Sequence, residues 1–307
     1  MKSIFIDCNN QLEPVFARVH RPDDPPIVVN TKPFERADLP RLLDGYAICL
    51  DDHSYMPTEF ISRCPNLKHI VFLGTGASSY MDVPALKDLG VTVHTIKGYG
   101  DTAVAEHTVA LMFACARKLA RMDRAVRAGT WTPLEGAQLH GKTLGVIGLG
   151  GIGREVARIG RGIGMQVIAW NRSKRPDAGV PLVELDELLA RADVVSLNLV
   201  LNDETRGIID AKRIARMKRG VILVNTARGA LIDEAALVDA LRSGQIGHAG
   251  LDVFHAEPLA ADHPLARMDN VTLSAHAAFR TLEASMTLIR RAIDIVRTIT
   301  GMPPVSK

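Results

Sequence analysis

The stretch 144–172 constrains the fold of this chain more than any other part of its sequence. An apolar run, Leu144–Ile147, precedes the segment Gly148-Leu149-Gly150-Gly151-Ile152-Gly153, which has the pattern G-x-G-x-x-G. A helical pattern follows, and then a second apolar run, Gln166–Trp170. Because a strand, a glycine turn, a helix and a strand in this order are the context in which that pattern is meaningful, we predict a βαβ unit here.

The glycines of this segment have separate physical tasks. Gly148 permits a tight turn, Gly150 lets a phosphate approach the backbone, and Gly153 lets the helix pack closely on the strand. The first N–H groups of the helix, at Gly151 and Ile152, then face the anion. Glycine-rich turns also occur without a ligand, but in this context we interpret the segment as a dinucleotide site.

Composition excludes several classes of partner. The chain has 307 residues, enough for two domains of about 150 residues each. Its 47% hydrophobic and 23% charged content is ordinary for a globular protein, and a net charge of +3 favours no nucleic-acid partner. The longest apolar stretch, 103–116, carries Glu106 and His107 and is too short to cross a bilayer, so we expect no membrane association.

Cysteine usage points to a reducing compartment. Cys8, Cys49, Cys64 and Cys115 are scattered and form no C-x-x-C pair. We therefore expect reduced, partly buried thiols, with neither a disulfide framework nor a metal site. Because no signal peptide is recognisable at the start of the chain, we expect a cytoplasmic protein.

The chain alternates apolar runs with helical segments on both sides of a long helix. Strands are predicted near 4–6, 47–50, 69–73, 91–95, 193–199, 220–225, 248–253 and 270–274, and helices near 58–64, 84–89, 185–191, 210–217 and 234–243. This alternation favours parallel sheets. A helix capped by Asp101 or Thr102 is predicted to run to about Met122, and a last helix, 281–300, to return to the first half.

Chemically versatile side chains follow three predicted strands of the second half. Arg228 lies in the segment Asn225–Gly229, and its planar guanidinium matches a carboxylate. Asp252 ends the next strand, Glu257 lies on the loop after it, and His276 follows the last strand. Taken singly, Arg228 is by default a surface arginine and His276 a packed histidine, and the two acids could both be solvated.

Taken together, these side chains match what the reduction of a 2-keto acid requires. The reaction needs a cation for the carboxylate and the developing oxyanion, which Arg228 can supply. It also needs a proton donor that works near neutral pH, such as His276, and a hydride source. A glutamate hydrogen-bonded to the imidazole would orient the ring and favour its charged form.

The sequence resembles the family of D-isomer-specific 2-hydroxyacid dehydrogenases over nearly its whole length. Five segments carry the resemblance: 102–108, 141–145, the glycine segment 148–153, 225–229, and 250–254 with Glu257-Pro258. The resemblance implies two Rossmann-like or flavodoxin-like, doubly wound parallel-sheet α/β domains with the site in an interdomain cleft, usually as a homodimer. We expect residues 1–98 and 281–307 to form the substrate domain and 99–280 the NAD(P)-binding domain.

The resemblance also implies roles for individual residues. Arg228 resembles the family's ligand of the substrate carboxylate and carbonyl, His276 its acid/base, and Glu257 the partner of that histidine. The loop 73–76 resembles the loop whose N–H groups bind the substrate carboxylate; it comprises Leu73, Gly74, Thr75 and Gly76. Asp252 resembles the acid that holds the nicotinamide carboxamide, and the same likeness adds Thr102, Thr226 and Ala227 to the cofactor contacts.

Some positions depart from the family pattern. Asn198 and Val200 stand where members often have histidine and proline, and His276 lies between Ala275 and Ala277 rather than between a proline and an Ile-Gly pair. These departures concern the shape of the pocket and the identity of the substrate, and leave the reaction type as predicted.

The end of the second strand of the βαβ unit bears on the choice of cofactor. NAD-binding proteins commonly have an aspartate there, which accepts a hydrogen bond from the ribose 2′-OH. This chain instead has Asn171, followed by Arg172, Ser173, Lys174 and Arg175. Cations and a hydroxyl suit a 2′-phosphate, so we predict a preference for NADP(H). In the other interpretation Asn171 binds the 2′-OH and NAD serves.

Several functions are compatible with this pattern. We favour reduction of a small 2-keto acid such as glyoxylate or hydroxypyruvate to the D-hydroxy acid, or the reverse. A phosphoglycerate, formate or phosphite dehydrogenase is an alternative, although we expect a feedback-regulated form to need further sequence. A non-catalytic, nucleotide-sensing corepressor would not need Arg228, Glu257 and His276 together. The loop 129–141, with Trp131, is read either as a contact with a second subunit or as a surface loop.

Overall fold

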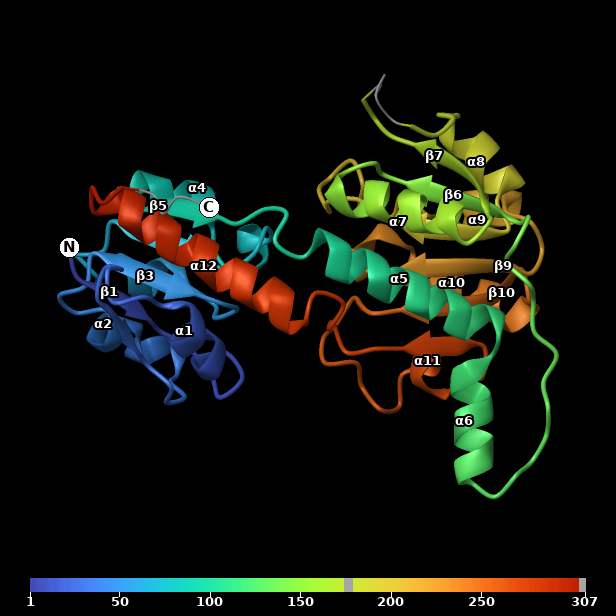
Figure 1. The fold of residues 1–307 in the computed structure, drawn as a ribbon, viewed down its shortest axis with the longest axis horizontal. Helices are drawn as coiled ribbons and strands as arrows, with labels where there is room; N and C mark the ends of the chain where they lie inside the picture. The colour runs from blue at the N-terminus through green and yellow to red at the C-terminus, as the bar shows by residue number, and fades with distance from the viewer. Residues whose placement is uncertain (174–178, 304–307) are drawn as a thin grey trace. The chain divides into compact units, whose positions relative to one another are not determined.

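The computed structural model describes residues 1–173 and 179–303 and divides into two compact units. The first unit comprises Met1–Gly100 and Arg280–Lys307, and the second unit comprises Asp101–Phe279 (Figure 1). Each unit contains one parallel sheet. The chain therefore consists of two doubly wound α/β units, as the sequence predicts.

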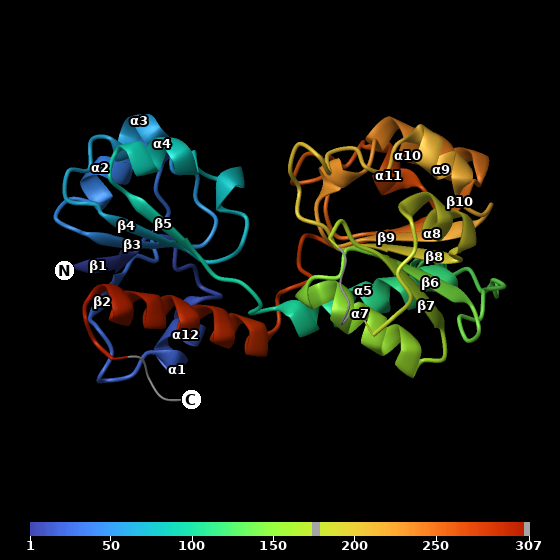
Figure 2. The ribbon, with the colours of Figure 1, turned by 90° about the horizontal axis from the view of Figure 1, so that it is seen from above.

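The sheet of the first unit has the strand order β2-β1-β3-β4-β5. Its strands are β1 (Ser3–Phe5), β2 (Ile27–Val29), β3 (Ile48–Asp51), β4 (His69–Phe72) and β5 (Thr92–Thr95). Helices α1 (Glu13–Val19) and α12 (Leu282–Ile299) cover one face, and α2 (Leu39–Leu42), α3 (Thr58–Ile61) and α4 (Val83–Asp88) cover the other (Figure 2). Because side chains alternate along a strand, Phe5 and Ile4 enter different cores.

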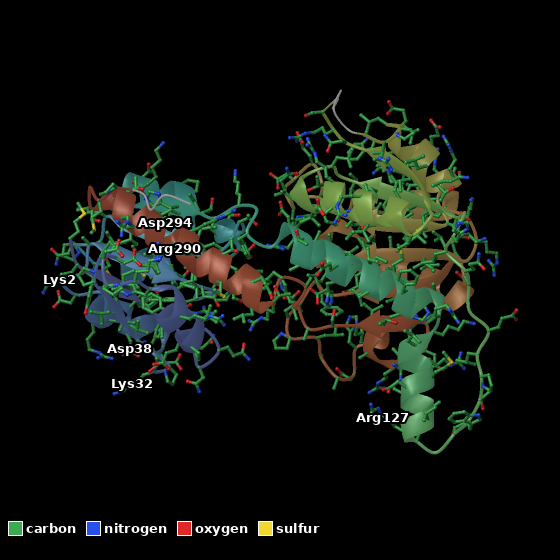
Figure 3. The ribbon with its side chains drawn as sticks, in the orientation of Figure 1. Lys2, Lys32, Asp38, Arg127, Arg290 and Asp294 are labelled. Carbon is green, nitrogen blue, oxygen red and sulfur yellow. The ribbon has the colours of Figure 1, made fainter. Side chains whose placement is uncertain are left out.

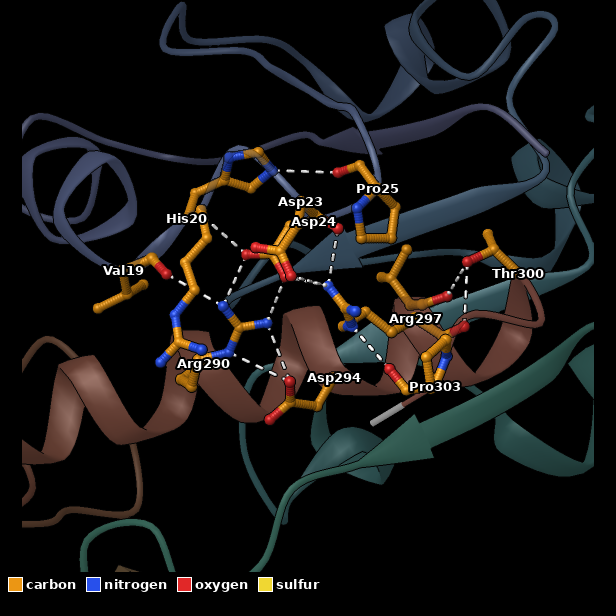
Figure 4. A network of polar contacts seen from close by, with 12 residues as sticks. Val19, His20, Asp23, Asp24, Pro25, Arg290, Asp294, Arg297, Thr300 and Pro303 are labelled. Carbon is orange, nitrogen blue, oxygen red and sulfur yellow. Dashed lines mark hydrogen bonds and ion pairs between the residues drawn. The ribbon is translucent and has the colours of Figure 1, made fainter. Parts of the chain in front are cut away.

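A buried ionic network fastens α12 to the N-terminal part of the first unit (Figure 4). The Asp24 carboxylate accepts hydrogen bonds from Arg290 Nη1 and Nη2 at 2.6 and 2.8 Å and from Arg297 Nη1 at 2.9 Å. Arg290 also bonds Asp294 one helical turn away, and these two side chains lie together on α12 in Figure 3. This network joins the last helix to a loop near the start of the chain.

The sheet of the second unit has the strand order β11-β10-β9-β8-β6-β7. Its strands are β6 (Thr143–Ile147), β7 (Gln166–Trp170), β8 (Val194–Leu197), β9 (Val221–Asn225), β10 (Ile246–Leu251) and β11 (Val271–Leu273). The chain moves outward from β6 in both directions, which creates a switch point between β6 and β8. Ligands of such sheets bind beyond the carboxyl ends of the strands at this point.

Helices cover both faces of this second sheet. α5 (Asp101–Ala116) and α7 (Gly151–Gly162) pack on one face, and α8 (Leu185–Arg191), α9 (Ala211–Arg216) and α10 (Glu234–Ser243) on the other (Figure 2). The short helix α11 (Pro264–Arg267) precedes β11. Local signals set the ends of α10: the Asp233 side chain accepts the N–H of Ala236, and Gly244 ends the helix at φ +74°.

The chain path differs from the prediction at two places. The helix predicted to run to Met122 ends at Ala116, because Lys118 takes a left-handed conformation at φ +53° and a separate helix, α6 (Leu119–Arg127), begins. Strand β2, which the prolines before it obscured, was not predicted. Arg127 lies near the far end of α6 in Figure 3. Among the described residues, none of the helices is both long enough and apolar enough to cross a membrane.

Candidate active site

The predicted catalytic side chains lie on loops that follow three adjacent strands of the second unit. Strand β10 pairs with β9 through Leu251 and Asn225, and with β11 through Leu251 and Leu273. The register therefore brings the carboxyl ends of all three strands to the same edge of the sheet. Arg228, Glu257 and His276 follow these ends.

Glu257 and His276 form a direct pair. Nδ1 of His276 lies 2.6 Å from Oε2 of Glu257, and the side chains remain 31% and 34% exposed. The other carboxylate oxygen of Glu257 accepts the N–H of Phe254 at 2.9 Å. Burial acts to raise the pKa of Glu257, but the hydrogen bonds from His276 and Phe254 and the charge of Arg228 outweigh it and hold the pKa below its usual value.

The backbone of His276 is held in an unusual conformation. Its φ is +49°, in the left-handed region that residues with a side chain seldom adopt. Its N–H donates to the backbone oxygen of Asp252 at 2.8 Å. A left-handed residue costs about 1–2 kcal/mol, so contacts around the turn must offset this strain.

Asp252 supplies those contacts. Its side chain is fully buried. Oδ1 accepts the hydroxyl of Ser274 at 2.6 Å and the N–H of Ala277 at 3.0 Å, and Oδ2 accepts the N–H of Ala278 at 2.9 Å. Asp252 therefore organises the turn that carries His276.

The loop with Arg228 is built on a buried amide. The side chain of Asn225 donates to the oxygen of Arg228 at 2.9 Å and accepts the N–H of Ala227 at 3.0 Å. A Cβ on Gly229 would lie 2.2 Å from the backbone of Phe254, so the 225–229 loop packs directly on the loop that leads to Glu257. This places the partly exposed Arg228 guanidinium where its charge acts on Glu257.

The glycine turn fits a dinucleotide sterically. Gly148 has φ +95°, and a Cβ on Gly153 would lie 1.9 Å from the oxygen of Gly148, so neither position accepts a side chain. A Cβ on Gly151 would lie 1.7 Å from the Asp101 carboxylate. At Gly150, in contrast, the same construction meets nothing within 4 Å. The turn therefore packs tightly against the protein at Gly148, Gly151 and Gly153 and leaves space at Gly150. Ile152 is partly exposed in the first turn of α7.

The remaining predicted cofactor contacts in the second unit differ in their exposure and in the hydrogen bonds that they already make. Asn171 is bound within its own loop, since its side chain accepts the N–H of Leu149 at 3.0 Å and donates to the oxygen of Ser173 at 2.8 Å. Arg172 pairs with the exposed Glu204. Lys174 and Arg175 lie outside the described residues. The two remaining threonines contrast: Thr102 is exposed, whereas Thr226 is buried and its hydroxyl lies 2.7 Å from that of Thr108.

The predicted substrate loop belongs to the first unit. Leu73 is buried and donates its N–H to the oxygen of Asp51 at 2.7 Å, and the oxygen of Gly74 accepts the N–H of Ile96 at 2.9 Å. Among the described residues, the N–H groups of Thr75 and Gly76 have no recorded acceptor. The loop is followed by a 3₁₀ turn, Ala77–Ser79. Two N–H donors are thus available at the carboxyl end of β4.

Sequence reasoning missed two residues that contact this site. Nε2 of His107, on α5, lies 2.9 Å from the Ser274 hydroxyl and 3.6 Å from Asp252 Oδ1. His107 belongs to the segment 102–108 and Ser274 precedes His276 by two residues. These two positions were the available signal in the sequence. Sequence spacing does not reveal, however, that helix α5 reaches the turn that carries His276.

Comparison with known proteins supports this description. The sequence model described as "D-isomer specific 2-hydroxyacid dehydrogenase, NAD binding domain" matches residues 109–278. A D-3-phosphoglycerate dehydrogenase from Archaeoglobus fulgidus is 38% identical over 276 residues, covering 87% of this chain and 52% of that protein. A hydroxypyruvate reductase from Thermotoga maritima is 41% identical over 247 residues, covering 78% and 79%.

A solved structure gives the same result for the fold. The pyruvate reductase of Chlamydomonas reinhardtii is similar over 100% of this chain and 98% of its own, with a TM-score of 0.87 and 31% identity. The matched part of this chain spans about half the length of the phosphoglycerate dehydrogenase and nearly the whole of this reductase.

Proposed function

Because the chain belongs to the D-isomer-specific 2-hydroxyacid dehydrogenase family, we propose that it transfers a hydride between a nicotinamide cofactor and a small 2-keto or D-2-hydroxy acid. The observation that carries this proposal is the Glu257–His276 pair, joined at 2.6 Å on a turn beside the fully buried Asp252. Glyoxylate and hydroxypyruvate are the substrates we favour.

In this proposal His276 transfers the proton. Its Nδ1 faces the Glu257 carboxylate and carries a hydrogen, so Nε2 is the atom that exchanges a proton with the substrate oxygen. Glu257 fixes the plane and the tautomer of the ring and stabilises its charged form, while Phe254 fixes Glu257. Each group is held by a neighbour before substrate arrives, which lowers the cost of orientation in the transition state.

Arg228 and the 73–76 loop bind the acid in this proposal. The guanidinium pairs with the substrate carboxylate and with the oxygen that becomes negative during reduction. The N–H groups of Thr75 and Gly76 supply further donors to the carboxylate. Arg228 thus binds both ground state and transition state, whereas His276 acts on the transition state alone.

The cofactor is held by the glycine turn. Gly148, Gly150, Gly151, Ile152 and Gly153 bind the pyrophosphate, with further contacts from Thr102, Thr226, Ala227 and Asp252. When bound, the nicotinamide supplies the hydride. Asn171, Arg172 and Ser173 favour NADP(H), because no carboxylate stands at residue 171 to repel a 2′-phosphate. The side chain of Glu204 must release Arg172 for this contact, and exposed pairs of this kind are weak.

We further propose a cytoplasmic homodimer. Within the described chain no residue of α6 is buried, and Leu119 and Val126 are 51% and 50% exposed. Trp131, on the following loop, is 84% exposed. A second copy of the chain would cover this apolar surface. All four cysteines are free and buried, which suits a reducing compartment.

A phosphoglycerate, formate or phosphite dehydrogenase is the second candidate, since a phosphoglycerate dehydrogenase is 38% identical to this chain. A nucleotide-sensing corepressor is disfavoured by the Glu257–His276 pair, which sensing alone does not need. The test is the oxidation of NADH and NADPH, followed at 340 nm, with glyoxylate, hydroxypyruvate, pyruvate and phosphohydroxypyruvate. We expect the small keto acids and NADPH to give the highest kcat/KM. Absence of turnover with all of them would contradict the proposal.

A further inference from the structure

A chain of hydrogen bonds runs from helix α5 to the turn that carries His276. Nε2 of His107 lies 2.9 Å from Oγ of Ser274, and Oγ of Ser274 lies 2.6 Å from Oδ1 of Asp252. The carboxylate of Asp252 then accepts the N–H groups of Ala277 and Ala278 at 3.0 and 2.9 Å. Three structural elements are thereby joined through one carboxylate.

The direction of the chain follows from counting hydrogens. A carboxylate only accepts, so the hydroxyl of Ser274 must give its single hydrogen to Asp252. The oxygen of Ser274 can then only accept from His107. Nε2 of His107 must therefore carry a hydrogen, and the order His107 to Ser274 to Asp252 is fixed.

This arrangement bears on His276 because Asp252 holds three consecutive N–H groups. Its backbone oxygen accepts the N–H of His276 at 2.8 Å, and its side chain accepts those of the next two residues. These bonds surround the residue whose φ is +49°. A carboxylate deprived of Ser274 would be free to turn, and the left-handed turn would lose the contacts that offset its strain.

We propose that His107 and Ser274 are positioning residues, which act on the proton-transferring His276 through Asp252. The inference rests on the proposed function of His276. A purely structural role would lower stability alone, whereas a positioning role lowers kcat and loosens the turn. The same strands offer a matched control: Nε2 of His248 lies 3.1 Å from the Thr272 hydroxyl, a buried histidine–hydroxyl pair between β10 and β11.

The experiment compares Ser274→Ala and His107→Leu with the conservative variants Ser274→Thr and His107→Gln, and with the control Thr272→Val. In the full chain, we expect amide hydrogen exchange at Ala277 and Ala278 to quicken about tenfold in the first two variants. We expect kcat for the best keto acid to fall about 10- to 100-fold with KM changed less than about threefold. The conservative variants should recover most of the loss, and the double variant should be no worse than either single one.

Four results would overturn the proposal: unchanged exchange at Ala277 and Ala278, an unchanged kcat in variants of an active enzyme, an equal effect of Thr272→Val, or a histidine ¹⁵N spectrum in which Nε2 of His107 carries no hydrogen. Exchange and the ¹⁵N spectrum do not depend on turnover. If wild-type protein reduces no keto acid while exchange responds as expected, the proposed function fails and the positioning of the turn stands.

Discussion

Two charged clusters, one in each unit, show how similar side chains serve different ends. In the first unit the Asp24 carboxylate is fully buried and receives Arg290, Arg297 and the N–H of Arg21, the last at 2.7 Å. In the second unit Glu257 and His276 are joined as closely, at 2.6 Å, but each stays about one third exposed. One cluster is sealed, and the other is open to solvent on one side.

The difference lies in the atoms that the protein leaves unused. Both oxygens of Asp24 are bonded to arginines, and the network ends within the first unit. Among the described residues, Nε2 of His276 has no recorded partner, although Nδ1 is fully engaged. A saturated cluster can only stabilise, whereas a cluster with one oriented, unsatisfied atom can react.

Removing the His276 side chain, whose Nε2 has no partner among the described residues, should have the largest effect on kcat. We expect His276→Ala to lower kcat about 10²- to 10⁴-fold, because it removes the general acid, with a small change in melting temperature. The control is His263→Ala, which breaks a second histidine–glutamate pair of the same unit, 3.3 Å from Glu234. Steady-state kinetics with the best keto acid decide the matter. Comparable losses from both variants would contradict the assignment of the proton transfer to His276.

Removing the buried Asp24 carboxylate should lower the stability of the protein and leave its kcat unchanged. We expect Asp24→Ala to reduce the free energy of unfolding by about 3–5 kcal/mol, because two buried guanidinium groups lose their partner. Urea unfolding at pH 7 measures this loss, and kcat per folded molecule should stay the same. A large fall in kcat with unchanged stability would reverse the comparison.

The pH dependence of the sealed cluster has a definite sign. Burial acts to raise the pKa of Asp24, but the hydrogen bonds from Arg290, Arg21 and Arg297 outweigh it and hold the pKa far below its usual value. A lowered folded-state pKa contributes stability above the unfolded pKa of about 3.9, and this contribution is lost as pH falls toward the folded value. The stability gap between wild type and Asp24→Ala should therefore be constant from pH 7 to 5 and narrow below about pH 4.

The neutral variant Glu257→Gln should have an intermediate effect on the open cluster. We expect kcat/KM to fall about 10- to 100-fold, the equivalent of one hydrogen bond to a charged group. Because the pKa of Glu257 is held below its usual value, its carboxylate should stay ionised from pH 8 to 5 and gain a proton only at lower pH. A ¹³C carboxyl signal of Glu257 that already moves above pH 6 would show that Glu257 is not a persistent carboxylate.

The smallest effect should come from the solvent-exposed ion pair between Arg172 and Glu204. Arg172 and Glu204 are each 69% exposed, and such pairs contribute about 0–1 kcal/mol. We expect Glu204→Gln to raise kcat/KM for NADPH by up to about fivefold, and Arg172→Ala to lower it, with little change for NADH. Equal effects on both cofactors would contradict a contact with the 2′-phosphate.

Local features of the sequence determined much of the architecture. The glycine segment 148–153 and the apolar runs around it specified a strand, turn and helix, because backbone sterics and side-chain period act between near neighbours. The helices Leu185–Arg191 and Glu234–Ser243 were predicted at their observed bounds for the same reason. The types of residue at 228, 257 and 276 also limited the chemistry that the chain can perform.

Tertiary structure alone decided which distant groups meet. Arg290 joins Asp24 across 266 positions, and His107 reaches Ser274 across 167. Tertiary structure also decided three further features: the end of α5 at Ala116, the left-handed conformation of His276 and the contact of Gly229 with Phe254. Such pairings depend on how sheets and helices pack after they form. Each competes with many other partners of similar energy, so no local pattern specifies them.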